Sequence, residues 1–125
     1  MYKRQDKIFA ITSHLPHLIA YNLILTATNF KISNKDNVLR FSAGGLRDFS
    51  RIAASNEIMW RDIFFNNKSN MLKVIDLFIK NLKIFKQDIK LNRKNLETKL
   101  KNLKKARQQI VLLKQDTSKP DFGRI

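Results

Sequence analysis

The chain has 125 residues, 43% of them hydrophobic, with only 3 Gly and 2 Pro, so we expect one all-α domain (residues 1–125) built from helices with few connections. It contains no cysteine, which excludes disulfides, thiolate metal sites and a cysteine nucleophile. The formal net charge is +15, so nucleic acid and anionic membrane surfaces have to be weighed as partners.

The first predicted helix runs from about Asp6, as N-cap, to about Asn29. Apolar residues lie on most of its faces, which favours a central helix, and Pro16 should kink it. Basic residues followed by the apolar stretch Ile8–Ala27 are also typical of a signal peptide or membrane span. Five polar or helix-breaking residues argue against both, so we expect a soluble, cytoplasmic protein without a membrane partner: Ser13, His14, Pro16, His17 and Asn22.

Two shorter helices are predicted in the middle of the chain. Residues 31–40 are polar and typical of a surface loop. Residues 42–45 then suggest a turn into a helix over about 46–54. Ser55 or Asn56 can cap the next helix.

A single long helix, capped by Ser69 or a neighbour, is predicted to follow. Its apolar seam has spacings of three and four, then of seven, as in a coiled coil, although Asn92 and Lys99 interrupt it. Such a helix needs a partner, and a second copy of the chain is the simplest one, so we expect a helical bundle that is intertwined as a homodimer. Residues 115–125 should form an irregular tail. The seam consists of Ile75, Phe78, Leu82, Phe85, Ile89, Leu96, Leu103 and Ile110.

The same stretch is strongly basic. From Lys80 to Lys114 there are twelve Lys or Arg, against only Asp88 and Glu97. We favour a solvated helical face, because Phe85 is the one aromatic residue there and nothing else could stack on bases. A small basic helical protein that binds nucleic acid or an anionic membrane surface remains the alternative hypothesis.

The first cluster that could carry chemistry is Ser13–His17. Because His14 and His17 are three residues apart, they lie near each other on one helical face. No third ligand stands at a suitable spacing, so we predict no metal site. A hydrogen-bonded core residue is the plainer interpretation of His14, while for His17 the structural and functional interpretations are balanced.

The second cluster begins at Gly44 and Gly45, which lead into a helix whose free N–H groups could accept a carboxylate or phosphate. Asp48 and Arg51 are three residues apart, so Asp48 could hold the guanidinium ready for a substrate carboxylate. The plainer alternative is a helix start with a surface ion pair of small energetic value. A dinucleotide fingerprint is excluded, since there is neither a GxGxxG motif nor a preceding strand.

The third cluster surrounds Trp60, in Met59–Asp62. A lone Trp can shape a pocket wall, but from the pattern alone it is a core residue. No catalytic constellation is complete within the chain, so we predict no catalytic residue in it.

These three clusters carry a family resemblance. Residues 13–18, 44–53 and 59–64 resemble, in order and spacing, the C-terminal helical domain of prephenate/arogenate (cyclohexadienyl) dehydrogenases. Residues 115–117 and 120–124 look like the tail of some bacterial members, so the resemblance covers nearly the whole chain.

The resemblance implies an activity for the complete enzyme. Members oxidatively decarboxylate prephenate to 4-hydroxyphenylpyruvate, or arogenate to tyrosine, and pass a hydride to NAD or NADP in tyrosine biosynthesis. A Rossmann domain comes first and carries the cofactor site and the catalytic histidine. The helical domain that follows dimerises and closes the substrate pocket.

By motif, the resemblance also implies site residues. Arg51 would bind a substrate carboxylate, and Asp48 and His17 would join the polar network around it. Gly44 and Gly45 would lie close to an active site, that of the same or of the partner subunit.

Two further roles follow from the resemblance: Trp60 would support the pocket wall, and His14 would be structural. The departure from the family is the absence of a Rossmann domain in residues 1–125, so we expect one to act in cis or in trans. We therefore expect no cofactor to bind this chain alone, with NAD or NADP bound in the complete enzyme, and no dehydrogenase activity from the chain alone.

Overall fold

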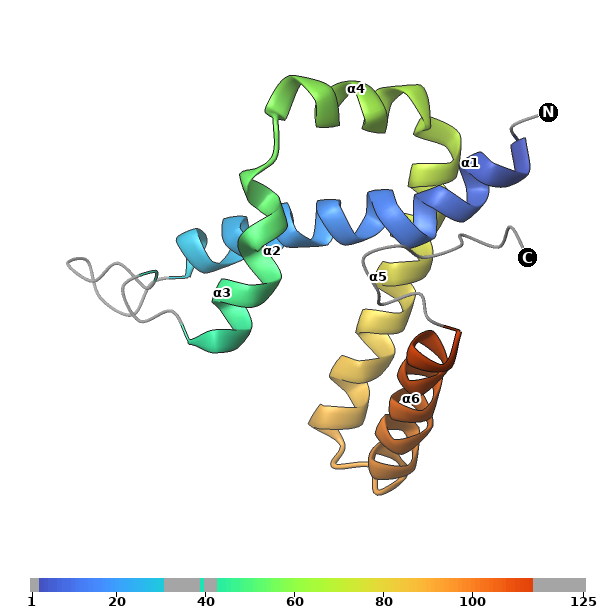
Figure 1. Ribbon diagram of the computed structural model, residues 1–125. Coiled ribbons are helices and arrows are strands. Elements are labelled where there is room, and N and C mark those ends of the chain that lie inside the picture. The colour runs from blue at the N-terminus through green and yellow to red at the C-terminus, as the bar shows by residue number, and fades with distance from the viewer. Residues whose placement is uncertain (1–2, 31–38, 40–42, 114–125) are drawn as a thin grey trace. The chain divides into compact units, whose positions relative to one another are not determined.

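The computed structural model describes residues 3–30, 39 and 43–113 of the chain (Figure 1). Within these ranges the regular elements are helices and no strand occurs, which confirms the predicted all-α class. The chain divides into two units, residues 1–79 and 80–125, and each is described by itself. The predicted tail (115–125) and, apart from Leu39, the predicted loop (31–40) lie outside the described residues.

The first unit begins with one long helical run. It consists of α1 (Lys3–Phe9), a π-helical turn η1 (Ala10–His14) and α2 (Leu15–Asn29). Asp6 lies inside this run, so its prediction as N-cap was wrong: the Lys, Arg and Gln before it are good helix formers and extend the helix. The irregularity expected from Pro16 takes the form of η1, in which the Leu15 N–H bonds to the Ala10 carbonyl five residues back.

This helical run is less covered than a central helix would be. Its buried residues are Ala10, Leu15 and Ala20, so the other described helices cover it only in part. By length and composition alone, Lys3–Asn29 could cross a membrane, with a mean hydropathy of 1.4, although one such helix is weak support for a membrane protein. Large apolar side chains on the run are instead exposed: Ile8, Phe9, Ile11 and Leu25.

The remaining helices of the first unit pack around this run. The helix α3 (Gly44–Ser50) continues into a 3₁₀ helix η3 (Arg51–Ala54), and both contact α2. The helix α4 (Glu57–Asn66) begins after Asn56, whose Oδ1 accepts a hydrogen bond of 2.9 Å from the Met59 N–H. Of the two predicted caps, Asn56 is therefore the one that acts.

The predicted long final helix is two helices, α5 (Lys68–Lys90) and α6 (Asn95–Leu112), so that prediction was wrong. The break lies at Asn92, which adopts a positive φ of 50°. Asn tolerates this left-handed conformation better than most residues do. The Arg93 N–H then bonds to the Asp88 carbonyl at 3.0 Å, the closing bond of a Schellman helix end.

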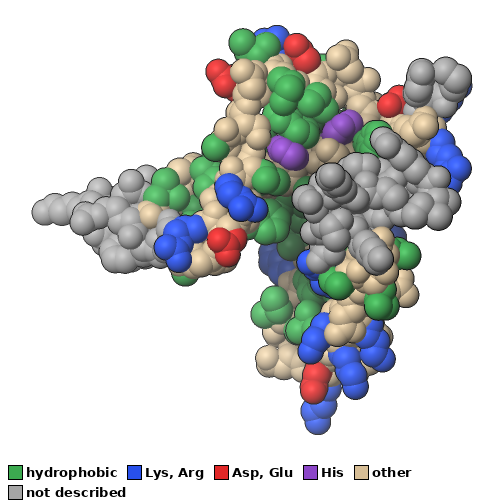
Figure 2. All heavy atoms as spheres, in the orientation of Figure 1, with side chains coloured by type: hydrophobic (Ala, Val, Ile, Leu, Met, Phe, Trp, Pro, Cys, Tyr) green, Lys and Arg blue, Asp and Glu red, His purple; other side chains and the backbone are tan. Residues whose placement is uncertain are grey.

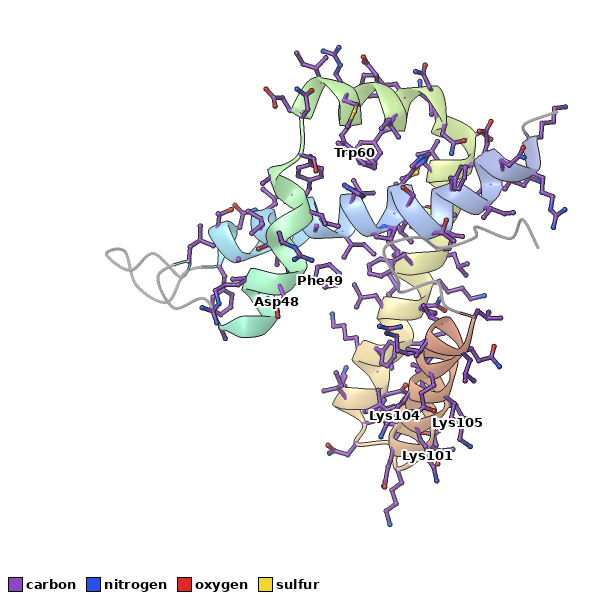
Figure 3. The ribbon with its side chains drawn as sticks, viewed as in Figure 1. Asp48, Phe49, Trp60, Lys101, Lys104 and Lys105 are labelled. Carbon is purple, nitrogen blue, oxygen red and sulfur yellow. The ribbon has the colours of Figure 1, made fainter. Side chains whose placement is uncertain are left out.

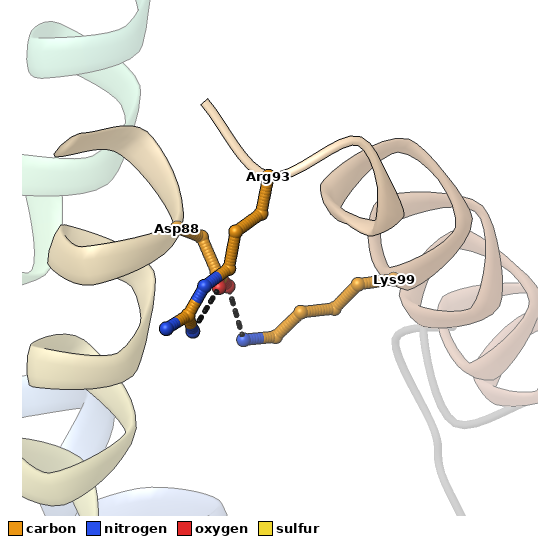
Figure 4. A network of polar contacts seen from close by, with 3 residues as sticks. All are labelled: Asp88, Arg93 and Lys99. Atoms are coloured by element: carbon orange, nitrogen blue, oxygen red, sulfur yellow. Dashed lines mark hydrogen bonds and ion pairs between the residues drawn. The ribbon is translucent and has the colours of Figure 1, made fainter. Parts of the chain in front are cut away.

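The second unit is a helical hairpin whose two helices are joined by hydrogen bonds at Asp88 (Figure 4). Its buried carboxylate accepts hydrogen bonds of 3.1 Å from Arg93 Nη1 and of 3.1 Å from Lys99 Nζ. The Lys99 ammonium also lies 4.0 Å from the centroid of the Phe85 ring. The hydrogen bond from Lys99 is the main reason why the pKa of Asp88 is lowered. One acidic side chain thus joins the end of α5 to α6 in an otherwise basic stretch.

The hairpin leaves much of its apolar surface uncovered. In the described part of the chain no large side chain is fully buried, and α6 has no buried residue at all. Figure 2 shows Lys and Arg side chains gathered on the hairpin. In Figure 3, Lys101, Lys104 and Lys105 extend from α6. Between these cations α6 exposes five apolar side chains: Leu100, Leu103, Ile110, Val111 and Leu112.

Candidate functional site

Trp60 is the centre of the most closely packed cluster in the first unit. Its side chain is 7% exposed and points from α4 toward the α2 helix (Figure 3). The ring of His17 stacks on the indole with 3.6 Å between centroids and an angle of 16° between planes. The ring of His14 meets the indole edge-on, with 6.0 Å between the centroids. The centroid of the Phe64 ring lies 5.7 Å from that of the indole. The first and third sequence clusters therefore form one aromatic group.

His14 is fixed by a side chain that the sequence did not single out. Its Nδ1 lies 3.2 Å from Nδ2 of the buried Asn67, which also donates to the Asp6 carbonyl at 2.9 Å. Burial lowers the pKa of His14, Asp6 opposes this effect, and His17 adds to it. These contacts hold the His14 ring in place within the first unit. Asn67 was missed because its place in the sequence, next to Asn66, gives no signal of burial.

His17 is held by its own helix. Its Nδ1 lies 3.1 Å from the carbonyl oxygen of Ser13, one turn earlier. Both His14 and His17 are partly exposed, and both reach the surface on the face shown in Figure 2, next to apolar side chains. The indole and the two imidazoles thus form a wall with aromatic faces and ring nitrogens that a ligand could contact.

The second cluster lies on α3 and η3, which pack on α2. Asp48 and Arg51 are exposed, and no ion pair joins them in the described part of the chain, so the predicted pairing was wrong for a single chain. α3 ends at Ser50 and Arg51 begins the 3₁₀ helix η3, so the two residues do not lie in one continuous α-helix. Neither residue contacts the His17–Trp60 pair among the interactions of the described residues.

Packing among the described residues does not require the glycine pair. A Cβ atom on Gly45 would have no neighbour within 4 Å, and on Gly44 it would meet Arg47 Nη2 at 3.9 Å, an ordinary contact. The helix starts without a side-chain cap, since Ala43 precedes it in an extended conformation. The described residues therefore give no steric reason for glycine at either position.

Tyr21 carries a buried hydroxyl that has no hydrogen-bond partner among the described residues. It lies four residues after His17, on the same side of α2. A buried polar group without a partner lowers stability, unless water or a ligand provides the missing bond.

We expect Tyr21→Phe to leave the free energy of unfolding within about 1 kcal/mol of the parent chain, or to raise it, because the substitution removes an unsatisfied hydroxyl and keeps the ring. Urea unfolding followed by circular dichroism measures this. A loss above about 2 kcal/mol would mean that the hydroxyl has a partner within the protein.

Cofactor and metal sites are not offered by the described residues. No group of three or more His, Cys, Asp or Glu side chains in them could hold a metal ion. A dinucleotide site requires a strand, a glycine-rich loop and a helix, whereas residues 3–30 and 43–113 form helices only.

Comparisons of sequence relate the chain to one group of enzymes. The family model described as "Prephenate dehydrogenase, dimerization domain" matches residues 3–115. The cyclohexadienyl dehydrogenase of Zymomonas mobilis is 42% identical over 81 residues, which cover 65% of this chain and 28% of that protein. The prephenate dehydrogenase of Bacillus subtilis is 38% identical over 80 residues, which cover 64% of this chain and 21% of that protein.

Comparison of structures gives the same group. The crystal structure of a prephenate dehydrogenase from Aquifex aeolicus, in complex with hydroxyphenyl propionate and NAD⁺, matches with a TM-score of 0.77 and 39% identity. The match covers 84% of this chain and 37% of that chain. A second crystal structure of prephenate dehydrogenase from Aquifex aeolicus matches with a TM-score of 0.75. The chain spans roughly a quarter of the length of the curated relatives, 28% and 21%.

Proposed function

Since the chain belongs to the prephenate dehydrogenase dimerization-domain family, we propose that it forms the homodimer of a dehydrogenase and closes the substrate pocket of that enzyme. The family expected from residues 13–18, 44–53 and 59–64 is confirmed by the match over residues 3–115. The relatives give no support to the alternative of a basic protein that binds nucleic acid or membranes.

The observation that carries the homodimer is the uncovered apolar surface of the helices. Exposed side chains of the predicted seam continue from α5 into α6, for example Leu82, Leu103 and Ile110. Apolar side chains gathered on a helix without buried residues favour an interface, because water is a poor solvent for them. A second copy carries the same seam and can cover it by two-fold symmetry.

The proposed substrate is prephenate or arogenate, both of which carry carboxylates. Arg51 is exposed and its guanidinium has no acidic partner among the described residues, so it is available to a carboxylate. The stack of His17 on Trp60 would form the pocket wall, with Asp48, Gly44 and Gly45 around the same pocket. NAD or NADP would accept the hydride from a nucleotide-binding domain, in cis or in trans, in the cytoplasm.

Arg51→Ala tests the substrate part of this proposal. In the chain joined to the nucleotide-binding domain of a relative, we expect kcat/KM for prephenate or arogenate to fall roughly 100-fold or more, since losing one partner of a charged pair costs about 2–5 kcal/mol. Arg51→Lys should recover little, because an ammonium does not reproduce the two-pronged contact.

Arg47→Ala is the matched control, since Arg47 is also exposed and lies four residues earlier, on α3. It should keep turnover within about threefold, in line with the small effect of surface charges. Equal losses in both variants, or full turnover in Arg51→Ala, would rule out Arg51 as the carboxylate ligand.

A further inference from the structure

The amide of Asn67 can be oriented in one way only. Its Nδ2 lies 2.9 Å from the Asp6 carbonyl oxygen, and its Oδ1 lies 2.8 Å from Nδ2 of Asn70. A carbonyl oxygen accepts hydrogen bonds and cannot donate, so the NH₂ group of Asn67 has to face Asp6. One N–H is then used for Asp6, and the other is directed to His14, at 3.2 Å.

This orientation fixes the protonation of His14. Because the Asn67 amide donates to Nδ1, that ring nitrogen has to be the acceptor, and the single proton of the neutral ring is on Nε2. In a charged imidazolium both ring nitrogens carry a proton. The Nδ1–H of His14 would then face an N–H of Asn67, and the hydrogen bond between them would be lost. Burial, which lowers the pKa of His14, favours the same neutral form.

His17 is held in the opposite way. Its Nδ1 lies 3.1 Å from the Ser13 carbonyl oxygen, which can only accept. The proton of the neutral His17 ring is therefore on Nδ1, and Nε2 keeps its lone pair. Both rings contact the indole of Trp60, so two histidines of opposite tautomer lie in one cluster, with Nε2 protonated in His14 and unprotonated in His17.

We propose that Asn67 is a positioning residue, which holds His14 as the neutral tautomer protonated on Nε2, opposite to the tautomer that Ser13 selects at His17. Such a pair suits a ligand group that both accepts and donates a hydrogen bond, such as a hydroxyl. This statement about the ligand rests on the proposed dehydrogenase function. The assignment of the two tautomers rests on the hydrogen bonds alone.

Nitrogen-15 NMR of the histidine rings tests the assignment on the full 125-residue chain. The chain contains 2 His, so two sets of ring signals are expected, and His14→Gln identifies them. At neutral pH we expect His14 as the Nε2–H tautomer and His17 as the Nδ1–H tautomer. A spectrum of the parent chain in which His14 carries its proton on Nδ1 would overturn the proposal, whatever the fate of the variants.

Asn67→Asp should reverse His14 and leave His17 unchanged. Carboxylate oxygens only accept, so His14 would move its proton to Nδ1, and the added negative charge would raise the pKa of His14 toward or above its ordinary 6.5. Asn66→Asp makes the same chemical change at the neighbouring exposed position and should leave the tautomer of His14 as it is. A folded Asn67→Asp chain with an unchanged His14 signal would contradict the role of Asn67. The NMR result does not depend on turnover, so it is distinguishable from a failure of the Arg51 experiment.

Discussion

Trp60→Ala is expected to lower the free energy of unfolding by about 3–5 kcal/mol, the usual cost of removing a large buried aromatic side chain. The indole is the contact between α4 and the helical run that carries His14 and His17, and few other buried side chains support this unit. Replacement by alanine removes the stacked face and leaves a cavity. Urea unfolding followed by circular dichroism at constant protein concentration measures the loss.

Two further variants test whether this loss comes from the aromatic contacts of Trp60. Trp60→Phe keeps an aromatic face for His17 and should lower the free energy of unfolding by less than half as much as Trp60→Ala. Arg61→Ala changes the next residue of the same helix. Among the described residues, the side chain of Arg61 makes only an exposed ion pair, with Asp62, so this substitution should cost less than about 1 kcal/mol. If Trp60→Ala cost no more than Arg61→Ala, the aromatic cluster would not be what holds α4 in place.

Much of the helical pattern could be predicted from local chemistry. The scarcity of Gly and Pro indicated helices, and Asn56 caps α4 as a capping residue should. Pro16 was expected to kink the first helix, and the irregularity that the structure has there is the π-helical turn η1, just before Pro16. The sequence pattern does not give which carbonyl the Leu15 N–H bonds to, so the π-helical form was not predicted.

The end of α5 could not be predicted, because the apolar seam continues through it. Leu96 and Leu103 keep the seven-residue step on the far side of the turn, so the periodicity alone indicates one helix. The break depends on contacts between residues distant in sequence, above all the pair of Asp88 and Lys99. A single Asn at position 92 then supplies the left-handed residue.

The candidate site was predicted in its parts but not in its contacts. The sequence singled out His17 and Trp60 separately, and only the fold stacks one on the other. Asn67 gave no signal, because an asparagine between two helices looks like any other interruption until the fold buries it. The pairing of Asp48 with Arg51 was wrong because a spacing of three brings two exposed side chains within reach of each other but does not fix their rotamers.

Leu103→Glu is expected to dissociate the proposed homodimer. Leu103 is 50% exposed on α6, so within a single chain the carboxylate of a glutamate there can reach solvent. In a two-fold interface built on the seam, the substitution would bury one unpaired carboxylate from each copy. Burying an unpaired charge costs several kcal/mol, so the dimer Kd should rise by about 1000-fold or more.

Light scattering measures the outcome. The parent chain should have twice the mass of the 14.7 kDa monomer at low and at high salt, because an apolar interface is not screened, and Leu103→Glu should have the monomer mass. Gln108→Glu adds the same charge and side chain to α6, five residues further on and on a different face of the helix, and should leave the dimer intact. A parent chain that is monomeric would contradict the homodimer itself. A dimer that survives Leu103→Glu would place the interface elsewhere, on the exposed apolar face of Lys3–Asn29 rather than on the hairpin.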